Sequence, residues 1–464
     1  MNRYSNESMR FALASILLNG STFRRKIIAI AQEKYRARPT EVGLDHEQLL
    51  KACLHFEKRE THFRLGMLGL GVVALTGLAA PLFGVLGVLG LVVLQVVKNH
   101  QERFVYADYF SRDNYHDDSS MQFLSEDKNM SEYRDDLGQS QNVTIYSDFD
   151  PFSVAGIGMG GWSFSIDISR PSELLTSNME VELFGLYDIY GFVEKGIKNL
   201  KMDNLSISDH FFINGRDVQE FKELLPNQYQ APIQLLSDQD VAKFQLQSDV
   251  LRHYKWIQIK DWGNDLVLSF FLRYEIRGSN LFIEVSKTLL TPISEQYRKI
   301  DNIMPSSISN DFALAFGSVL KTPFALIGAM GYLYIDFMRD FANIFGSVDR
   351  NARRQIRNSP LYNYGEGQSL RANMSSSQYA HYFQKMDKEF YTKTLEKTIL
   401  GSTIDFLERH NVDISELRDT QSTIINSGII VQGGDVNSKN IAVGKGARAS
   451  FGNMLNKVKS KATA

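Results

Sequence analysis

The sequence predicts an α+β protein that carries its own membrane anchor. Three segments support this prediction: an uncharged apolar run at 65–97, β-rich runs within 254–290, and a helix-periodic segment at 378–410. We therefore expect N-terminal helices and a transmembrane helical hairpin, followed by a β-rich cytosolic domain with an antiparallel meander. A C-terminal helical region and a short β-repeat tail should complete the chain.

Changes in composition suggest how the chain is divided. The 464 residues are enough for two or three domains, and 43% hydrophobic with 22% charged residues is the composition of a folded protein. The expected regions are an amphipathic helical region (1–64), the transmembrane hairpin (65–97), an acidic linker (98–141), the β-rich domain (142–300), a helical region (301–420), an assembly segment (421–450) and a basic tail (451–464).

Charge and cysteine content exclude several classes of protein. The formal net charge is -2, which makes a dedicated nucleic-acid binder a poor fit, so we expect no nucleic-acid partner. Cys53 is the only cysteine, which rules out an intramolecular disulfide and the usual cysteine-based zinc sites. These features predict a reducing compartment, and we expect no cofactor and no metal.

The uncharged run fits a membrane hairpin better than one span. A single helix over 65–97 would be about 50 Å long, whereas the hydrocarbon core is about 30 Å thick. Pro81 divides the run into 65–79 and 82–97, each slightly short for a full crossing, so we expect a turn at Ala80 and Pro81 in the far headgroup region. The alternative is a single kinked and tilted span.

Small residues and flanking charges complete the hairpin prediction. Small residues let membrane helices approach closely, and the residues expected at this contact are Gly66, Gly69, Gly77, Pro81, Gly84, Gly87 and Gly90. Basic residues flank the run on both sides, so both ends are expected in the cytoplasm. Before it, residues 11–18 predict a short amphipathic helix, and Asp45 should cap a helix that runs into the membrane.

A glycine-rich segment after the linker suggests a binding loop. The residues concerned are Gly156, Gly158, Gly160, Gly161 and Trp162. A phosphate-binding loop would lead into a helix, whereas these glycines lead into a strand, so we expect two strands joined by a glycine loop, which is either a hairpin turn or a binding loop. If the protein were an enzyme, Asp150 and Asp167 would line a pocket beside this loop.

The strongest β signal predicts three antiparallel strands. Turn residues at 262–265 and 277–280 separate runs rich in β-branched and aromatic residues. Another strand is expected in "HFFINGRDV", followed by a helix or loop around 224–245.

Two later segments are helical in pattern. Lys321 and Pro323 interrupt the apolar residues of 306–348 and leave too few in a row to span a membrane, so we favour a buried helix pair over a helix lying on the membrane. The apolar stripe along 378–410 fits a helix that packs on the core equally well as one that binds a partner protein.

The C-terminal tail contains two similar elevens, "NSGIIVQGGDV" and "NSKNIAVGKGA". Short β-prone stretches between glycines and asparagines suit stacked cross-β rungs, with Ile430, Val431, Ile441 and Val443 as the expected assembly residues. The alternative is a plain hairpin docked on the cytosolic domain.

Several of these parts together resemble a group of bacterial proteins that is frequent in actinobacteria. The residues that carry the resemblance are the membrane hairpin, "PF…GGWSFSIDI", "FFINGRDV", the meander ending "LFIEVS" and the tail "TIINSGIIVQGGDVNSKNIAVGKGARA". The resemblance implies the architecture, but it brings no activity and no catalytic residues. The tail also resembles glycine-punctuated assembly motifs of bacterial immune and cell-death signalling proteins.

These features predict a cytosol-facing, oligomeric assembly protein of the inner membrane, acting in anti-phage defence or stress signalling. The expected partners are the lipid bilayer, other copies of the chain, and a protein bound through the C-terminal helix or tail. The alternatives are a membrane-anchored enzyme with its site in 142–300 and a structural membrane scaffold. We name no catalytic residue, and catalysis has little support in the sequence.

Overall fold

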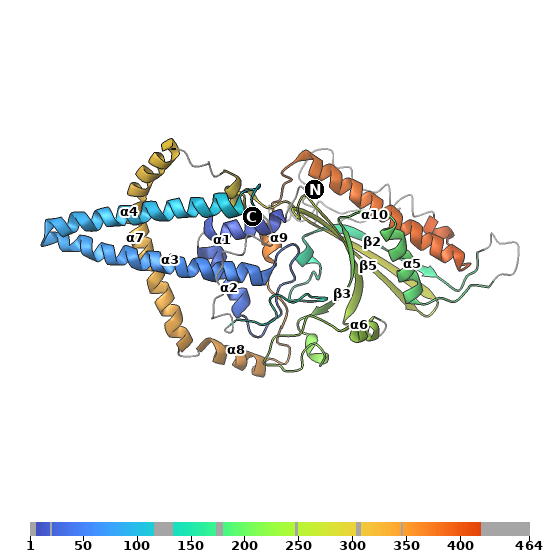
Figure 1. Ribbon diagram of the computed structural model, residues 1–464. Helices are drawn as coiled ribbons and strands as arrows, with labels where there is room; N and C mark the ends of the chain where they lie inside the picture. Colours follow the sequence, from blue (N-terminus) through green and yellow to red (C-terminus); the bar gives the residue numbers. More distant parts are fainter. Residues whose placement is uncertain are drawn as a thin grey trace, which may run out of the picture.

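A computed structural model describes residues 6–18, 21–115, 133–172, 180–245, 249–302, 308–344 and 347–418. One six-stranded sheet forms the body of the molecule, and a long helical hairpin projects away from it (Figure 1). The predicted α+β class is therefore confirmed.

The sheet is mixed, with strand order β1-β3-β4-β5-β6-β2. The strands are β1 (Val143–Tyr146), β2 (Ile157–Asp167), β3 (Leu205–Asn214), β4 (Arg252–Asp261), β5 (Leu266–Arg277) and β6 (Asn280–Leu290). β4, β5 and β6 pair antiparallel in succession, which confirms the predicted meander. Its two turns hold Gly263 and Gly278 at positive φ, as tight turns require.

The prediction that the strands on either side of the glycine-rich segment pair as a β-hairpin is wrong. β1 pairs parallel with β3 at one edge of the sheet, whereas β2 pairs antiparallel with β6 at the other edge. The pattern of residues indicates that each segment is a strand, but the choice of partner depends on contacts between residues far apart in the chain. The two strands on either side of the glycines are therefore widely separated.

Two helices cover one face of the sheet. α5 (Leu186–Lys198) and α10 (Tyr382–Arg409) pack on each other and on the side chains of β5 (Figure 1). Val193, Phe270 and Ile399 are fully buried where these three elements meet. The second face is covered in part by Val42 and by the 3₁₀ turn Ser153–Ala155.

Two short helices lie at the base of the hairpin. They are α1 (Glu7–Leu18) and α2 (Ser21–Gln32). α1 is present as predicted, but it is buried on every side from Glu7 to Ile16, so its expected amphipathic character is wrong. Its one cation, Arg10, is fully buried and donates to the Glu7 and Asp301 carboxylates and to the Phe110 carbonyl. A helix enclosed in this way can hold a charge only because the charge is paired.

The hairpin consists of α3 (His46–Leu75) and α4 (Pro81–Val105), joined by the 3₁₀ turn Thr76–Leu78. Asp45 caps α3 by accepting from the Glu47 and Gln48 amides, as predicted. Pro81 occupies the start of α4, where its missing N–H costs nothing. α4 runs on past residue 97, and a π-helical turn, Tyr106–Phe110, follows it.

A long helix, α7 (Ile308–Ile344), crosses the hairpin, and α8 (Ser347–Asn358) follows it (Figure 1). The buried helix pair expected for this segment is wrong, because α7 continues through Pro323 as one helix. A proline removes one backbone hydrogen bond but does not have to end a helix. Large apolar side chains of α7 are exposed, namely Leu320, Phe324, Ile327, Met330, Tyr334, Ile335, Phe337 and Met338.

Two shorter helices, α6 (Asp238–Phe244) and α9 (Leu370–Met374), complete the α-helices of the described residues.

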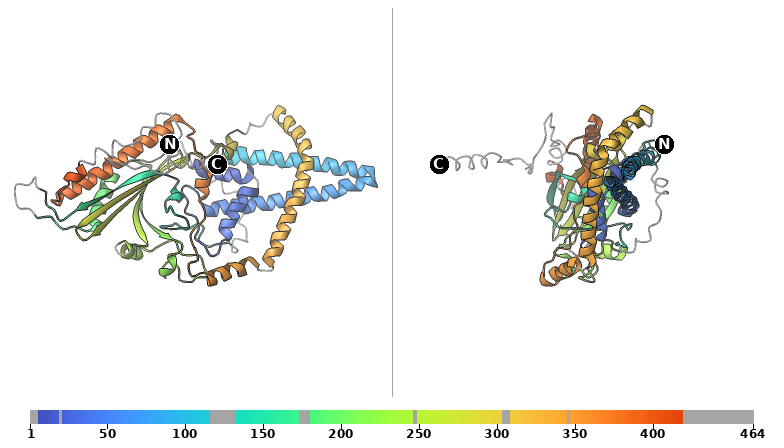
Figure 2. Two further views of the ribbon diagram at one scale, coloured as in Figure 1. Left: turned by 180° about the vertical axis from the view of Figure 1, so that it is seen from behind. Right: turned by 90° about the vertical axis from the view of Figure 1, so that its left-hand side faces the viewer.

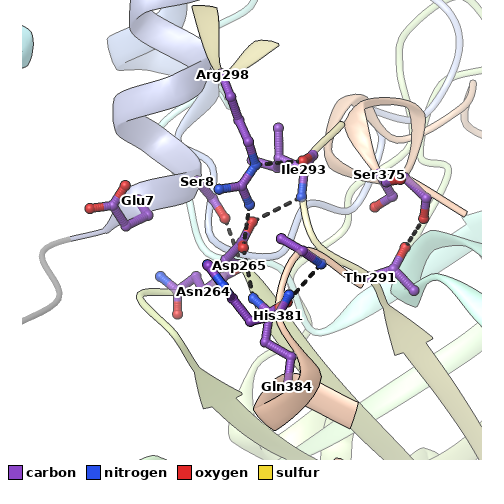
Figure 3. Close-up of polar contacts among 12 residues, drawn as sticks. Glu7, Ser8, Asn264, Asp265, Thr291, Ile293, Arg298, Ser375, His381 and Gln384 are labelled. Atoms are coloured by element: carbon purple, nitrogen blue, oxygen red, sulfur yellow. Dashed lines mark hydrogen bonds and ion pairs between the residues drawn. The ribbon is translucent and has the colours of Figure 1, made fainter. Parts of the chain in front are cut away.

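A polar junction joins the sheet to the helical base (Figure 3). Its centre is the buried Asp265, in the turn between β4 and β5, which accepts from the Ile293 amide at 2.8 Å and from the Gln384 side chain at 3.2 Å. Asp265 also pairs with Arg298. The turn therefore ties α10 and the segment after β6 to the sheet.

Candidate membrane-binding hairpin

The two helices of the hairpin are in backbone contact along a seam of small residues. A Cβ atom added to Gly77 would lie 2.5 Å from the Cα of Gly84. A Cβ atom added to Gly87 would lie 2.4 Å from the backbone nitrogen of Ala74. Real Cβ atoms do not approach backbone so closely, so only glycine fits at these places.

The other predicted glycines have different surroundings. Gly66 lies against the side chain of Leu94, and Gly90 lies against that of Leu70, in each case on the opposite helix. Gly69 has nothing within 4 Å of an added Cβ, so it faces open space instead of the seam. The spacing of Gly69 in the sequence resembles that of the neighbouring glycines. Only its angular position around the helix axis makes it face away from the opposite helix.

The outer surface of the hairpin is apolar and exposed. Its exposed large side chains include Val72, Leu75, Leu82, Val85, Leu86, Val88, Leu89 and Val93. In the described part of the chain, one helix, Pro81–Phe110, is long and apolar enough to cross a membrane. Soluble proteins rarely expose a continuous apolar surface of this kind, and such surfaces mark membrane or protein contacts.

A group of paired charges lies at the end of this apolar surface that is farthest from the hairpin tip. The Lys98 ammonium lies 2.8 Å from a Glu60 carboxylate oxygen, and Arg64 lies 3.4 Å from the same oxygen. Burial alone would raise the pKa of Glu60, but Lys98 and Arg64 outweigh it and hold that pKa below its ordinary value. The pair of Lys98 with Glu60 links α4 to α3, and the hairpin carries no charge between this group and its tip.

α7 contacts the hairpin a short distance on the tip side of these charges. Leu326 packs against Gly71, whose added Cβ would lie 3.0 Å from the leucine Cδ1. Ala329 is buried together with Met67 and Leu91. Sequence reasoning did not predict this contact with a third helix, because the glycine-rich run that contains Gly71 carries no sign of one.

The glycine-rich segment forms part of a strand instead of an open loop. Gly156 and Gly161 pack against backbone atoms of β6, and the pairing of β2 shifts register between Gly158 and Gly161. Gly158 and Gly160 have nothing within 4 Å of an added Cβ. Neither these glycines nor Trp162 line the cavities described below.

The two carboxylates predicted beside this segment hold local turns. Asp150 accepts from the Phe152 amide, and Asp167 accepts from the amide and the hydroxyl of Ser169. Neither carboxylate lines the cavities described below. The cavities described below therefore do not include the residues expected around the alternative enzyme site.

Two cavities lie on the second face of the sheet. The larger, of about 700 Å³, includes Ser163 and Ser165 of β2, but several of its charges pair with one another, as in the 2.6 Å contact of Arg273 with Glu275. The smaller, of about 380 Å³, lies beside the start of α3. One of its lining atoms, His46 Nε2, is buried without a hydrogen-bond partner among the described residues.

The electrostatics of the smaller cavity favour neutral groups. Burial, and after it the charge of Arg38, lowers the pKa of His46 to about 3, so the imidazole is neutral at pH 7. Burial also raises the pKa of the neighbouring Glu366 to about 8, although Thr40 donates to its carboxylate. Within the described ranges, no group of three or more histidine, cysteine, aspartate or glutamate residues is arranged to hold a metal ion.

The predicted assembly elements are described only in part. Ile430, Val431, Ile441 and Val443 lie outside the described residues. α10 uses its C-terminal half for the core, where Ile399 and Leu407 are fully buried. Near its start it exposes three aromatic side chains, namely Tyr382, Phe383 and Phe390. The helix therefore packs on the sheet through one half and leaves an apolar patch on the other.

Comparison with known proteins connects the chain to one family. No curated protein and no solved structure matches it. The family model described as the AbeC-like domain matches residues 161–437, which is more than half of the chain. The match begins within β2, so it includes most of the sheet, α7 and α10, and it leaves the hairpin outside. It supports the resemblance to a bacterial family, and the chain belongs to the AbeC-like family.

Proposed function

We propose that the protein is a membrane-bound component of bacterial anti-phage defence, in which the hairpin inserts into the inner membrane from the cytoplasm. The family supports the defence context, since an AbeC-like domain points to abortive infection. The observation that carries the proposal is the exposed apolar surface of α3 and α4, which ends at the paired charges of Glu60, Arg64 and Lys98. Lipid tails can cover the apolar surface, and headgroups and water can surround the paired charges.

The glycine seam explains how such a hairpin would stay closed in lipid. Lipid tails are as apolar as leucine, so the hydrophobic effect does not hold two membrane helices together. Backbone contact at Gly77, Gly84 and Gly87 gives the close packing that membrane helices use instead. We infer that the hairpin is a preformed membrane element.

Action in defence would follow from assembly of several anchored copies. A membrane anchor raises the local concentration of the chains, so weak contacts through residues 421–450 or the exposed start of α10 would be enough to associate them. Association would concentrate inserted hairpins at one place and disturb the bilayer of an infected cell. No cofactor or metal has a part in this proposal.

The test is a phage challenge combined with cell fractionation. Leu86→Lys with Val88→Lys places charges on the exposed surface of α4, whereas Leu183→Lys with Leu361→Lys places the same charges on exposed apolar residues of the body. The hairpin variant should leave the membrane fraction and lose protection against phage, and the body variant should keep both.

Circular dichroism of both purified variants checks that the sheet and helices are intact. Full protection by a folded hairpin variant that is found in the cytosol would refute the membrane role.

A further inference from the structure

α7 lies across the hairpin, with the tip on one side and the body on the other (Figure 2). Its contacts fix the level of the crossing at Met67 and Gly71 of α3 and at Leu91 of α4. The tip of the hairpin therefore projects beyond α7.

The contacts of α7 toward the body are polar. The Tyr332 hydroxyl donates to the Glu57 carboxylate. The centre of the Tyr332 ring lies 3.3 Å from Cζ of Arg64 and 4.7 Å from Cζ of Arg25. Glu57 and Arg64 precede Met67 on α3, so these contacts lie on the body side of the crossing.

Much of the described surface of α7 is apolar and exposed. Phe324 is 76% exposed and Ile327 is 66% exposed. A helix with a polar edge and a broad apolar face is typical of helices that lie in the plane of a membrane surface. The apolar surface of α7 is also continuous with that of the hairpin, because Leu326 and Gly71 are in contact.

We propose that α7 lies flat in the cytoplasmic leaflet and limits the depth of the hairpin, so that the hairpin enters the bilayer without crossing it. This proposal rests on the proposed membrane role and replaces the expectation of a turn in the far headgroups. The partner of α7 is the lipid of the cytoplasmic leaflet.

The length of the hairpin beyond α7 supports this geometry. At about 1.5 Å per residue, α3 and the turn after it rise about 12 Å from Gly71 to Ala79, and α4 rises about 15 Å from Pro81 to Leu91. The hydrocarbon core is about 30 Å thick. With α7 at the near interface, the tip therefore ends about halfway through the hydrocarbon.

The tip itself is suited to hydrocarbon. The Thr76 hydroxyl donates to the Val73 carbonyl at 2.7 Å, and the Ala79 and Ala80 amides donate to the Thr76 carbonyl. Pro81 has no N–H to satisfy. Residues 76–83 carry no charge and no tryptophan or tyrosine, which are the residues that usually anchor a segment at a membrane–water interface.

The test measures the depth of single fluorescent labels on the full chain bound to phosphatidylglycerol and phosphatidylethanolamine vesicles. Cysteines replace Leu82 at the tip, Ile327 on α7 and Leu183 on the body. Cys53 is buried, and burial raises the pKa of its thiol, so it should not compete for the label. Depth is read with lipid-attached quenchers, and an impermeant quencher is applied outside or trapped in the lumen.

We expect the label at Leu82 to lie deep, the label at Ile327 to lie shallow, and neither to respond to the luminal quencher. Quenching of the Leu82 label from the lumen would mean that the hairpin crosses, which overturns the proposal. An Ile327 label as accessible to the outside quencher as the Leu183 label would overturn it as well. If the Leu82 label stays in water, the proposed membrane role itself fails.

A pair of variants tests α7 independently. Ile327→Asp should weaken vesicle binding about tenfold or more, because it removes the burial of one large aliphatic side chain in lipid. Leu361→Asp is the matched control, since Leu361 is 68% exposed but lies after α8. Equal binding by both variants would contradict the contact of α7 with lipid.

Discussion

Replacing Gly87 by alanine should loosen the hairpin, whereas the same replacement at Gly69 should not. Gly87→Ala places a Cβ 2.4 Å from the Ala74 nitrogen and 2.6 Å from its Cα, so the helix backbones must move apart. Overpacking of this kind costs about 1–3 kcal/mol, and alanine returns up to about 1 kcal/mol through its helix propensity. Gly69→Ala gains the same propensity without the clash, because its added Cβ meets nothing within 4 Å.

The two variants should therefore differ by about 1–3 kcal/mol in the local stability of the hairpin. Hydrogen exchange of the α3 and α4 amides, measured in detergent micelles, reports this stability directly. Exchange in Gly87→Ala should be about 5- to 140-fold faster than in Gly69→Ala, since about 1.4 kcal/mol corresponds to a factor of ten. Equal exchange in the two variants would refute close packing at Gly87.

Three further predictions concern the body and the tail. Asp265→Ala should destabilise the sheet by about 3 kcal/mol, because it leaves the largely buried Arg298 without its carboxylate partner. Tryptophan fluorescence in urea measures this free energy of unfolding, and a loss below about 1 kcal/mol would contradict the prediction. Since burial raises the pKa of Glu366 in the folded state, its contribution to stability is complete below about pH 4.5 and is lost as the pH rises toward about 8. Glu366→Gln should remove this loss, and an unchanged pH dependence of the urea midpoint would count against the prediction. Replacing Ile430 and Ile441 by lysine should abolish oligomers in detergent, and oligomers of unchanged size would show that the tail is not the assembly element.

The sequence predicts the local elements of this protein well. The turn at Pro81, the cap at Asp45 and the meander turns at 262–265 and 277–280 each follow from residues close together in the chain. In each case the conformational preference of a few residues decides the structure.

The failures concern partners that are distant in the sequence. The apolar residues of 306–348 carry no sign of the hairpin on which α7 packs, so their pattern cannot show which of them stay exposed. The burial of α1 depends in the same way on contacts of Arg10 with Asp301 and Phe110. Gly156 and Gly161 permit close contact of β2 with β6, and glycine spacing alone does not distinguish such a contact from a binding loop.

The claim that the hairpin enters lipid is tested most directly by an environment-sensitive dye on Val88→Cys, with Leu183→Cys as the reference in the body. Both side chains are exposed in the structure, so both dyes should report water in the absence of lipid. On addition of vesicles the dye at position 88 should shift to the blue and gain intensity, while the dye at position 183 should not change. An unchanged spectrum at position 88, with protein and vesicles mixed at high lipid concentration, would contradict membrane insertion by the hairpin.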